Sequence, residues 1–289
     1  MPDSDPDASL RLASGPLTRR ALVKAGLGVG FCAAVAPVLA QTITTSAEGL
    51  IAGEATVPAG DADIPAYRAM PEGGGPFPTV LVIHEIFGVH EHIKDVCRRW
   101  ARLGYYAIAP ELFARQGDAA KEKDIPTLMA TIVARKSDAE VASDLDATLR
   151  FAAASGSADP ARAAVVGFCW GGRQTWLYAA HNPSLKAAVA WYGPLAVPTS
   201  ALRPKNPPDV VGELKVPTLG LYGGRDKGIP LDQIEAMQSK LAAAGGASRI
   251  IVYADAGHAF YADYRPSYVE ADAEASWKEA TAWLKAHGV

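Results

Sequence analysis

The sequence predicts an α/β fold with a mostly parallel central sheet, helices on both faces and an N-terminal antiparallel hairpin. Short apolar runs rich in β-branched residues alternate with longer amphipathic segments, which is the pattern of strands joined by crossover helices. The short runs are apolar at every position, as expected for strands that are covered on both faces.

The predicted elements follow one another in a regular order. A hairpin is expected at residues 48–70, because residues 58–61 read PAGD and interrupt the run with a turn. The predicted strands are residues 80–83, 106–109, 163–166, 187–190, 218–221 and 250–253. The predicted helices are residues 92–103, 138–154, 172–181, 231–244 and 266–286.

The composition fits a globular protein with a well-filled core. Of the 289 residues, 49% are apolar and 20% are charged, so the chain is too apolar for a disordered protein. Three cysteines are too few for a disulfide scaffold. The net charge of -3 argues against nucleic-acid binding, which needs a basic surface. Because no His, Cys or carboxylate cluster has ligand spacing, we expect no metal and no cofactor.

The first forty residues have the pattern of an export signal. Arg19 and Arg20, followed by Lys24, form a charged region, and an uncharged run rich in Gly and Ala follows at residues 25–40. Paired arginines with a lysine four residues on are typical of a twin-arginine signal, which exports folded proteins. We therefore expect residues 1–40 to engage the twin-arginine export machinery and to be cleaved, which makes the mature protein periplasmic or secreted.

An uncut membrane anchor is the main alternative to a cleaved signal. The apolar run is too short and too weakly hydrophobic to span a bilayer, so we expect no stable membrane anchor. Cys32 suggests a lipoprotein, but Phe31 stands where a lipid-attachment site needs a small residue. The remaining residues 41–289 are expected to form a single α/β domain.

Residues 167–172 read GFCWGG and lie between a predicted strand and a predicted helix. Strand, G-x-C-x-G and helix in succession predict a nucleophile elbow, a tight turn that raises its central side chain above the sheet. Serine is the usual nucleophile of this turn, and Cys169 stands in its place. The helix N-terminus that follows favours a thiolate and a developing oxyanion. The alternative is a buried structural cysteine beside packing glycines.

A thiol nucleophile needs a base, and the base needs a group that orients it. In hydrolases with this elbow, the acid and then the histidine follow the nucleophile along the chain. Asp226 follows the strand predicted at residues 218–221, and His258 follows the strand predicted at residues 250–253. Ligand crevices form at such carboxyl ends of parallel strands. We predict both as partners of Cys169, although each alone is typical of a capping Asp or a satisfied polar His.

Glu85 follows the strand predicted at residues 80–83, in the loop that normally supplies an oxyanion donor. A carboxylate that is shielded from water and faces a thiol can hold or take up the thiol proton. We expect Glu85 to govern when the thiolate exists, with a surface glutamate as the alternative. The neighbouring His84 is expected to be structural.

Together these segments resemble the dienelactone hydrolase (carboxymethylenebutenolidase-like) family of the α/β-hydrolase superfamily. The resemblance covers nearly all of residues 53–288. It depends on HEIFG at residues 84–88, APELF at 109–113, GFCWGG at 167–172, the Gly-x-x-Asp at 223–226 and GHAF at 257–260.

The resemblance implies an α/β-hydrolase fold and a hydrolase of carboxylic esters or lactones. It implies a two-step acyl transfer through a thioester, with Cys169 as nucleophile, His258 as base and Asp226 as its orienting acid. It further implies that Glu85 activates the thiol when substrate enters. The oxyanion hole would consist of the backbone N–H groups of Ile86 and Trp170.

Substrate recognition is expected from aromatic residues and one arginine. Family members that take dienelactones resemble one another in binding the substrate carboxylate with arginines, one of them shortly after the catalytic histidine. Here Arg265 comes later, and Asp263 would oppose an anion. The pocket is predicted to contain Phe87, Trp170, Tyr192, Phe260 and Tyr264, each of which is otherwise typical of packing. The alternative anion binders are Arg135, Lys136 and Arg173.

The chemistry of a thiolate favours activated substrates. A thiolate attacks well at neutral pH but is also a good leaving group, so adducts with poor leaving groups return to substrate. We therefore expect the protein to act on small-molecule esters or enol lactones rather than amides. We also expect a monomer. The alternatives are a broad esterase, thioesterase or peptidase, and a periplasmic binding protein without turnover. Cys97, in a predicted helix, is expected to be a packing residue.

Overall fold

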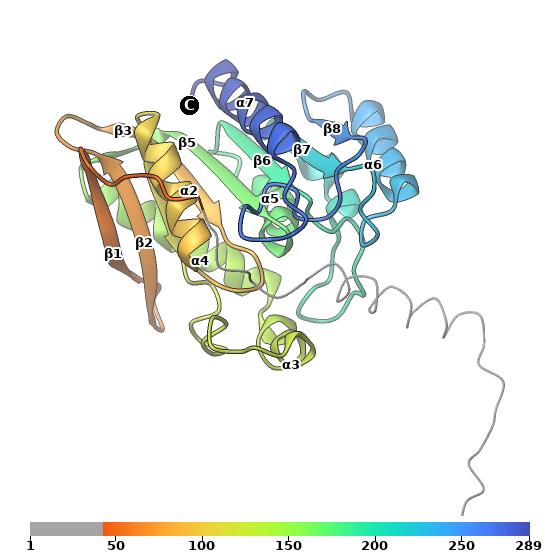
Figure 1. Ribbon diagram of the computed structural model, residues 1–289, viewed down its shortest axis with the longest axis horizontal. Helices are drawn as coiled ribbons and strands as arrows, with labels where there is room; N and C mark the ends of the chain where they lie inside the picture. Colours follow the sequence, from red (N-terminus) through yellow and green to blue (C-terminus); the bar gives the residue numbers. More distant parts are fainter. Residues whose placement is uncertain (1–42) are drawn as a thin grey trace, which may run out of the picture.

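The computed structural model describes residues 43–289, which contain one eight-stranded sheet with the strand order β1-β2-β4-β3-β5-β6-β7-β8 (Figure 1). Each predicted strand is confirmed. The strands are β1 Leu50–Pro58, β2 Asp63–Pro71, β3 Phe77–Ile83, β4 Tyr106–Pro110, β5 Ala158–Phe168, β6 Ala187–Trp191, β7 Thr218–Gly223 and β8 Arg249–Tyr253.

The sheet is mostly parallel, as predicted, and its antiparallel part is the N-terminal hairpin. β1 pairs with β2 in antiparallel register, with Leu50 opposite Pro71. β2 then pairs antiparallel with β4, and every later pairing is parallel. Figure 1 shows the hairpin in orange at one edge of the sheet and β8 at the other.

The helices agree with the predictions in all but three places. They are α2 Glu91–Arg102, α3 Ile125–Thr131, α4 Asp138–Ala154, α5 Trp170–His181, α6 Leu231–Ala244 and α7 Glu270–Ala286, with 3₁₀ turns η1 Val133–Arg135, η2 Pro207–Asp209 and η3 Val211–Glu213.

The differences lie at two helix starts and one short helix. α5 begins directly after Cys169, because the elbow turn takes only one residue. α7 begins at Glu270 and not at residue 266, since tight turns, such as the bond from the Tyr268 N–H to the Arg265 carbonyl, occupy the preceding segment. α3 was not predicted. It is held by its Asp124 cap and buries only Leu128, too little for a periodic apolar pattern.

The helices cover both faces of the sheet (Figure 1). α2 and α7 lie on one face, where the rings of Trp100 and Trp277 are 4.3 Å apart. Val80 and Val82 of β3 belong to the core on this side, whereas Leu81 belongs to the core that includes α4. α4, α5 and α6 cover the opposite face, as right-handed crossovers between parallel strands require. The alternate side chains of each central strand are therefore buried on both sides.

The chain changes direction across the sheet next to β3. The connection through α2 leads from β3 to β4 on one side, and the connection through α4 leads back to β5 on the other side. The loops that leave β3 and β5 therefore diverge at the carboxyl edge of the sheet. Such a switch point is where open α/β sheets form ligand crevices.

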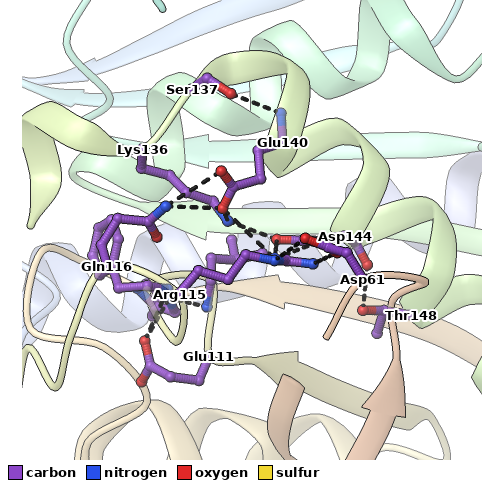
Figure 2. A network of polar contacts seen from close by, with 12 residues as sticks. Asp61, Glu111, Arg115, Gln116, Lys136, Ser137, Glu140, Asp144 and Thr148 are labelled. Atoms are coloured by element: carbon purple, nitrogen blue, oxygen red, sulfur yellow. Dashed lines mark hydrogen bonds and ion pairs between the residues drawn. The ribbon is translucent and has the colours of Figure 1, made fainter. Parts of the chain in front are cut away.

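A buried ion network ties the segment between β4 and α4 to the rest of the fold (Figure 2). The Lys136 amine lies 2.6 Å from Asp144 and also contacts Glu140. Arg115 donates to both oxygens of Asp144 at 2.9 Å and reaches Asp61 in the hairpin turn at 2.6 Å. Because Lys136 and Asp144 are buried, their pairing compensates the cost of removing both charges from water.

The predicted export signal lies outside the described residues. Within residues 43–289, no helix combines the length and apolar character that crossing a membrane requires.

Candidate active site

Cys169 occupies the tight turn between β5 and α5. Its backbone angles, φ 52° and ψ −119°, are uncommon for a residue with a side chain and mark a strained turn. Glycines allow the turn: a Cβ on Gly171 would lie 2.4 Å from the carbonyl oxygens of Ile83 and His84 at the end of β3. The predicted elbow geometry is therefore present, and Cys169 is only 3% exposed.

Cys169, His258 and Asp226 form a continuous line of polar contacts. His258 Nε2 lies 3.3 Å from Cys169 Sγ, and His258 Nδ1 lies 2.7 Å from Asp226 Oδ2. The other carboxylate oxygen of Asp226 accepts bonds from the N–H groups of Gly228 and Ile229, at 2.8 and 3.2 Å. The acid is thus fixed on both oxygens, and it fixes the imidazole toward the sulfur.

The loops that carry Asp226 and His258 are joined by backbone bonds. The Gly224 N–H donates to Tyr253 at 2.8 Å, and the Arg225 N–H donates to Ala256 at 2.8 Å. These bonds extend the pairing of β7 and β8 beyond the ends of the strands. The two side chains therefore meet although 32 residues separate them.

The charges at this site favour an imidazolium. Burial alone would lower the pKa of His258, but the charges of Cys169 and Asp226 and the hydrogen bonds to both outweigh it. The pKa of His258 rises to about 10. A protonated His258 at neutral pH places a positive charge beside the sulfur, which is the arrangement that stabilises a thiolate.

Two backbone N–H groups near the sulfur are candidates for an oxyanion hole. Neither the Ile86 N–H nor the Trp170 N–H donates a hydrogen bond within residues 43–289. Trp170 is the first residue of α5, so its N–H belongs to the unpaired groups of a helix N-terminus. Ile86 lies in the loop after β3, which the close approach at Gly171 presses against the start of α5.

His84 and Glu111 hold this loop in place. His84 Nε2 accepts the Leu112 N–H at 3.0 Å, so Nδ1 carries the proton and donates to the Glu85 carbonyl at 2.6 Å. Burial lowers the pKa of His84, which agrees with this neutral form. Glu111 accepts the Val89 N–H at 2.7 Å. Both side chains therefore act on the backbone of the loop and not on the sulfur.

Glu85 is buried and ionised, and its contacts are with Tyr264 and His90. It accepts a hydrogen bond from the Tyr264 hydroxyl and lies 3.5 Å from His90 Nε2. Burial alone would raise the pKa of Glu85, but the nearby His90 and the charge of Arg265 bring it to about 2. No hydrogen bond joins Glu85 to Cys169 in the described part of the chain.

Arg265 returns to the site despite its distance from His258 in the sequence. Its guanidinium lies 5.0 Å from the centre of the Phe87 ring and 5.2 Å from that of Tyr264. Burial alone would lower the pKa of Arg265, but the contact with Tyr264 and the negative charge of Glu85 raise it. Arg265 is thus a buried cation that interacts with residues around Cys169.

The expectation that Asp263 opposes an anion in the pocket is wrong. Asp263 bonds to the guanidinium of Arg99 and to His92 Nδ1, 3.0 Å away. Both partners belong to α2. The negative charge of Asp263 is therefore compensated where it stands, and it anchors the loop that carries Arg265.

The other candidate cations have different environments. Arg173 forms a buried bidentate pair with Asp138, at 2.7 and 2.9 Å, and Lys136 belongs to the network of Figure 2. Arg135 is exposed on η1. The pairs of Lys136 and Arg173 serve the fold, so of the cations named from the sequence Arg265 is the one with contacts to the pocket residues.

The predicted aromatic residues surround these groups. The Tyr192 ring lies edge-on to His258, with centroids 5.3 Å apart, and to Phe260 at 5.5 Å. Trp170 packs on Phe113 with centroids 4.6 Å apart. Sequence reasoning missed His90, which pairs with Glu85. The available signal was its position five residues after Glu85, at the start of α2.

Cys97 is completely buried in the core beside α2, and its thiol is free. Burial raises the pKa of Cys97, which keeps it a neutral thiol. Residues 43–289 bring together no group of three or more His, Cys, Asp or Glu side chains that could hold a metal ion.

The fold and this arrangement define an α/β-hydrolase, with the elbow after β5, the acid after β7 and the histidine after β8. The chain belongs to the dienelactone hydrolase family, whose family model matches residues 64–288.

Named relatives are similar over most of their length. The chain is 57% identical over 286 residues to a Methylorubrum extorquens protein named "Putative carboxymethylenebutenolidase", which covers 98% of both chains. The crystal structure of a "Putative Dienelactone Hydrolase" from Klebsiella pneumoniae superposes with a TM-score of 0.80 at 52% identity, over 82% of this chain and 98% of that one. A Bradyrhizobium protein named "Probable 2-oxo-3-(5-oxofuran-2-ylidene)propanoate lactonase" is 28% identical, over 77% of this chain and 89% of its own.

The raised pKa of His258 makes a prediction about the free enzyme. The pKa of His258 is about 10, above the ordinary 6.5. The protonated imidazole therefore contributes fully to folding stability below pH 6.5, and this contribution is lost as the pH rises through about 10. NMR titration of the imidazole should give this raised pKa of His258 directly. In Cys169→Ala, the pKa should fall because the interaction with the neighbouring sulfur is gone. An ordinary pKa in the native protein, or an unchanged pKa in the variant, would contradict this interaction of His258 with Cys169.

Proposed function

We propose that this member of the family hydrolyses carboxylic esters or lactones through Cys169 and a thioester intermediate. The observation that carries the proposal is the line from Asp226 through His258 to Cys169 Sγ, with separations of 2.7 and 3.3 Å, on a strained elbow turn. A nucleophile, its base and the orienting acid lie within contact of one another, as acyl transfer requires.

The first step is attack of the Cys169 thiolate on the carbonyl carbon. A C–S bond forms, and the π electron pair moves to the carbonyl oxygen. This oxygen accepts hydrogen bonds from the backbone N–H groups of Ile86 and Trp170. When this adduct collapses, the C–O bond breaks and its electron pair leaves with the alcohol or enol oxygen. His258 gives that oxygen a proton and becomes neutral.

The second step is hydrolysis of the thioester. Neutral His258 takes a proton from a water molecule while the water oxygen attacks the thioester carbon. The C–S bond then breaks, the electron pair returns to sulfur, and the carboxylic acid leaves. Because a thiolate leaves easily, the first step returns to substrate unless the alcohol or enol leaves easily as well, which favours enol lactones over amides.

The buried cation suggests that the substrate carries a carboxylate. Arg265 lies close to the rings of Phe87 and Tyr264 and interacts with Glu85, and Asp263 does not oppose an anion there. The name of the Bradyrhizobium relative describes an unsaturated lactone that bears a propanoate group. We propose that an anionic enol lactone binds with its carboxylate toward Arg265.

Glu85 is proposed to act only when substrate enters. In the free protein the Tyr264 hydroxyl and His90 hold its carboxylate. A substrate carboxylate at Arg265 would place a second negative charge beside Glu85, and this repulsion would favour its movement from Tyr264 toward the thiol. There it would accept the thiol proton of any protein molecule that has not already transferred it to His258.

We also propose export as a folded protein, based on Arg19, Arg20 and the run at residues 25–40. A reactive thiol is at risk in an oxidising compartment. Cys169 is 3% exposed in the folded chain, so folding before export would shield it.

The thioester route makes a direct prediction for Cys169→Ala. Hydrolysis of aryl esters and of a dienelactone by the purified mature protein should fall at least about 1,000-fold, because no other group replaces the nucleophile. Undiminished turnover would contradict the mechanism.

Glu85→Gln should slow the attack on substrate. Full activity in this variant would refute the activation role and leave the Cys169 mechanism intact.

Replacing Arg265 should separate anionic from neutral substrates. In Arg265→Met, kcat/KM for a carboxylate-bearing lactone should fall about 10- to 100-fold, the loss expected for one charged hydrogen-bonded contact. A neutral aryl ester of similar size should be much less affected. Arg135→Met is the matched control, because this exposed arginine should leave both substrates unchanged. Equal losses for both substrates would contradict carboxylate binding.

The export signal predicts where the protein accumulates. With Arg19→Lys and Arg20→Lys together, cell fractionation should show the protein retained in the cytoplasm, and the native chain from the periplasm should begin near Gln41 by mass spectrometry. Arg11→Lys is the control, because Arg11 lies in the leader outside the pair. Normal periplasmic accumulation of the double variant would contradict the twin-arginine route.

A further inference from the structure

Tyr192, the residue after β6, has a strained backbone beside the nucleophile. Its φ of 36° lies in the left-handed region that few residues with side chains adopt. Within residues 43–289, positive φ at residues other than glycine occurs at Cys169, Tyr192 and Ala259. Cys169 is the nucleophile and Ala259 follows His258, so the strain is concentrated around the site. Such strain persists where the surrounding structure enforces it, and it marks candidates for function.

The close packing of the end of β6 on α5 enforces this conformation. A Cβ on Gly193 would lie 2.3 Å from the carbonyl carbon of Gly172, so the two backbones touch. On the other side, the Tyr192 N–H donates to the Leu221 carbonyl at 2.8 Å. The backbone of Tyr192 is thus held from both sides, and its ring lies edge-on to His258.

The Tyr192 hydroxyl is buried and makes no hydrogen bond to any described residue. The side chain is completely buried, and its oxygen is one of the buried polar atoms of residues 43–289 without a hydrogen-bond partner. A hydroxyl left this way costs stability, so its persistence calls for an explanation. A partner that arrives with substrate supplies one.

The Tyr192 side chain belongs to the charged part of the site. Burial is the largest cause that raises the pKa of Tyr192, and the negative charges of Glu85 and Cys169 raise it further, whereas Arg265 lowers it. The Tyr192 ring contacts His258, whose Nε2 lies 3.3 Å from the Cys169 sulfur, so the side chain borders the proposed reacting groups. The hydroxyl stays protonated at neutral pH, so it can donate a hydrogen bond.

We propose that Tyr192 is a catalytic residue whose hydroxyl donates a hydrogen bond to the oxygen that leaves the carbonyl carbon. The inference rests on the proposed ester or lactone hydrolysis. The carbonyl oxygen already has two donors in that mechanism, the N–H groups of Ile86 and Trp170. The leaving oxygen has only His258, whose ring lies next to Tyr192. A donor from Tyr192 beside His258 would give the leaving oxygen two hydrogen-bond donors as well.

The hydrogen bond would act while the C–O bond breaks. The bonding pair moves onto the leaving oxygen, and the Tyr192 O–H stabilises the charge that develops there without giving up its proton. The proton that finally neutralises this oxygen comes from His258. The benefit is greatest for substrates whose leaving oxygen is strongly basic, since they develop the most charge that needs stabilisation. It is small for activated phenolates.

The test is Tyr192→Phe across a series of esters of one acid whose alcohols differ in pKa, measured as the rate of acylation in single turnovers. We expect a loss of about 10- to 100-fold for poor leaving groups, the loss expected for one hydrogen bond to a charged group. The loss should become small for nitrophenyl esters, so the rate should depend more steeply on leaving-group pKa than in the native protein. Thermal stability should be unchanged or higher, because an unpaired buried hydroxyl is removed.

Tyr106→Phe is the matched control, because Tyr106 also has a buried hydroxyl without a hydrogen-bond partner among residues 43–289 but lies at the start of β4, away from the carboxyl edge. Its dependence on leaving-group pKa should equal that of the native protein. An unchanged dependence in Tyr192→Phe, or an equal loss for every ester, would overturn the role of Tyr192 while Cys169→Ala remains inactive. Full activity in Cys169→Ala would overturn the proposed function itself.

Discussion

The site depends on three backbone segments that touch at the start of α5. Gly171 lies against the end of β3, where an added Cβ would be 2.4 Å from two carbonyl oxygens. Gly172 lies against the end of β6, where an added Cβ would be 2.5 Å from the Trp191 carbonyl oxygen. These contacts leave no room for side chains, so the three segments have one relative position. The elbow sulfur, the loop of Ile86 and the ring of Tyr192 are each attached to one of them. Their geometry is therefore set by packing before any substrate binds.

Buried charges in this protein fall into two groups with different consequences. The pairs of Lys136 with Asp144, Arg173 with Asp138 and Asp263 with Arg99 join secondary-structure elements and compensate charges that water cannot reach. His258, Glu85 and Arg265 lie around Cys169 instead. Cys169 and Asp226 raise the pKa of His258, whereas Glu85 and Arg265 shift each other's pKa values. Because the first group holds the loops, the second group stays close together although His258 and Arg265 are both cations. Dipoles and charges held in this way need little rearrangement during a reaction.

Much of the fold was predictable because it depends on local pattern. Fully apolar runs identified the six strands after the hairpin, and the order of Cys169, Asp226 and His258 after three of them identified the line of polar contacts. α3 was not predictable, since it buries a single side chain and has no periodic apolar face. The direction of Asp263 was predicted wrongly for a related reason. A residue in a turn can face either side, and Arg99 and His92, more than 160 residues earlier, decide which.

The sequence by itself determined the α/β class, the strand positions, the elbow and the three residues of the candidate nucleophilic line, because these follow from side-chain periodicity and from short motifs at strand ends. Only the tertiary structure decided where charges and hydroxyls point. It brought Arg265 back over Phe87, bound Glu85 to Tyr264 and left the Tyr192 hydroxyl without a partner. These outcomes depend on contacts between residues far apart in the chain, and no local pattern records which distant side chain fills the neighbouring space.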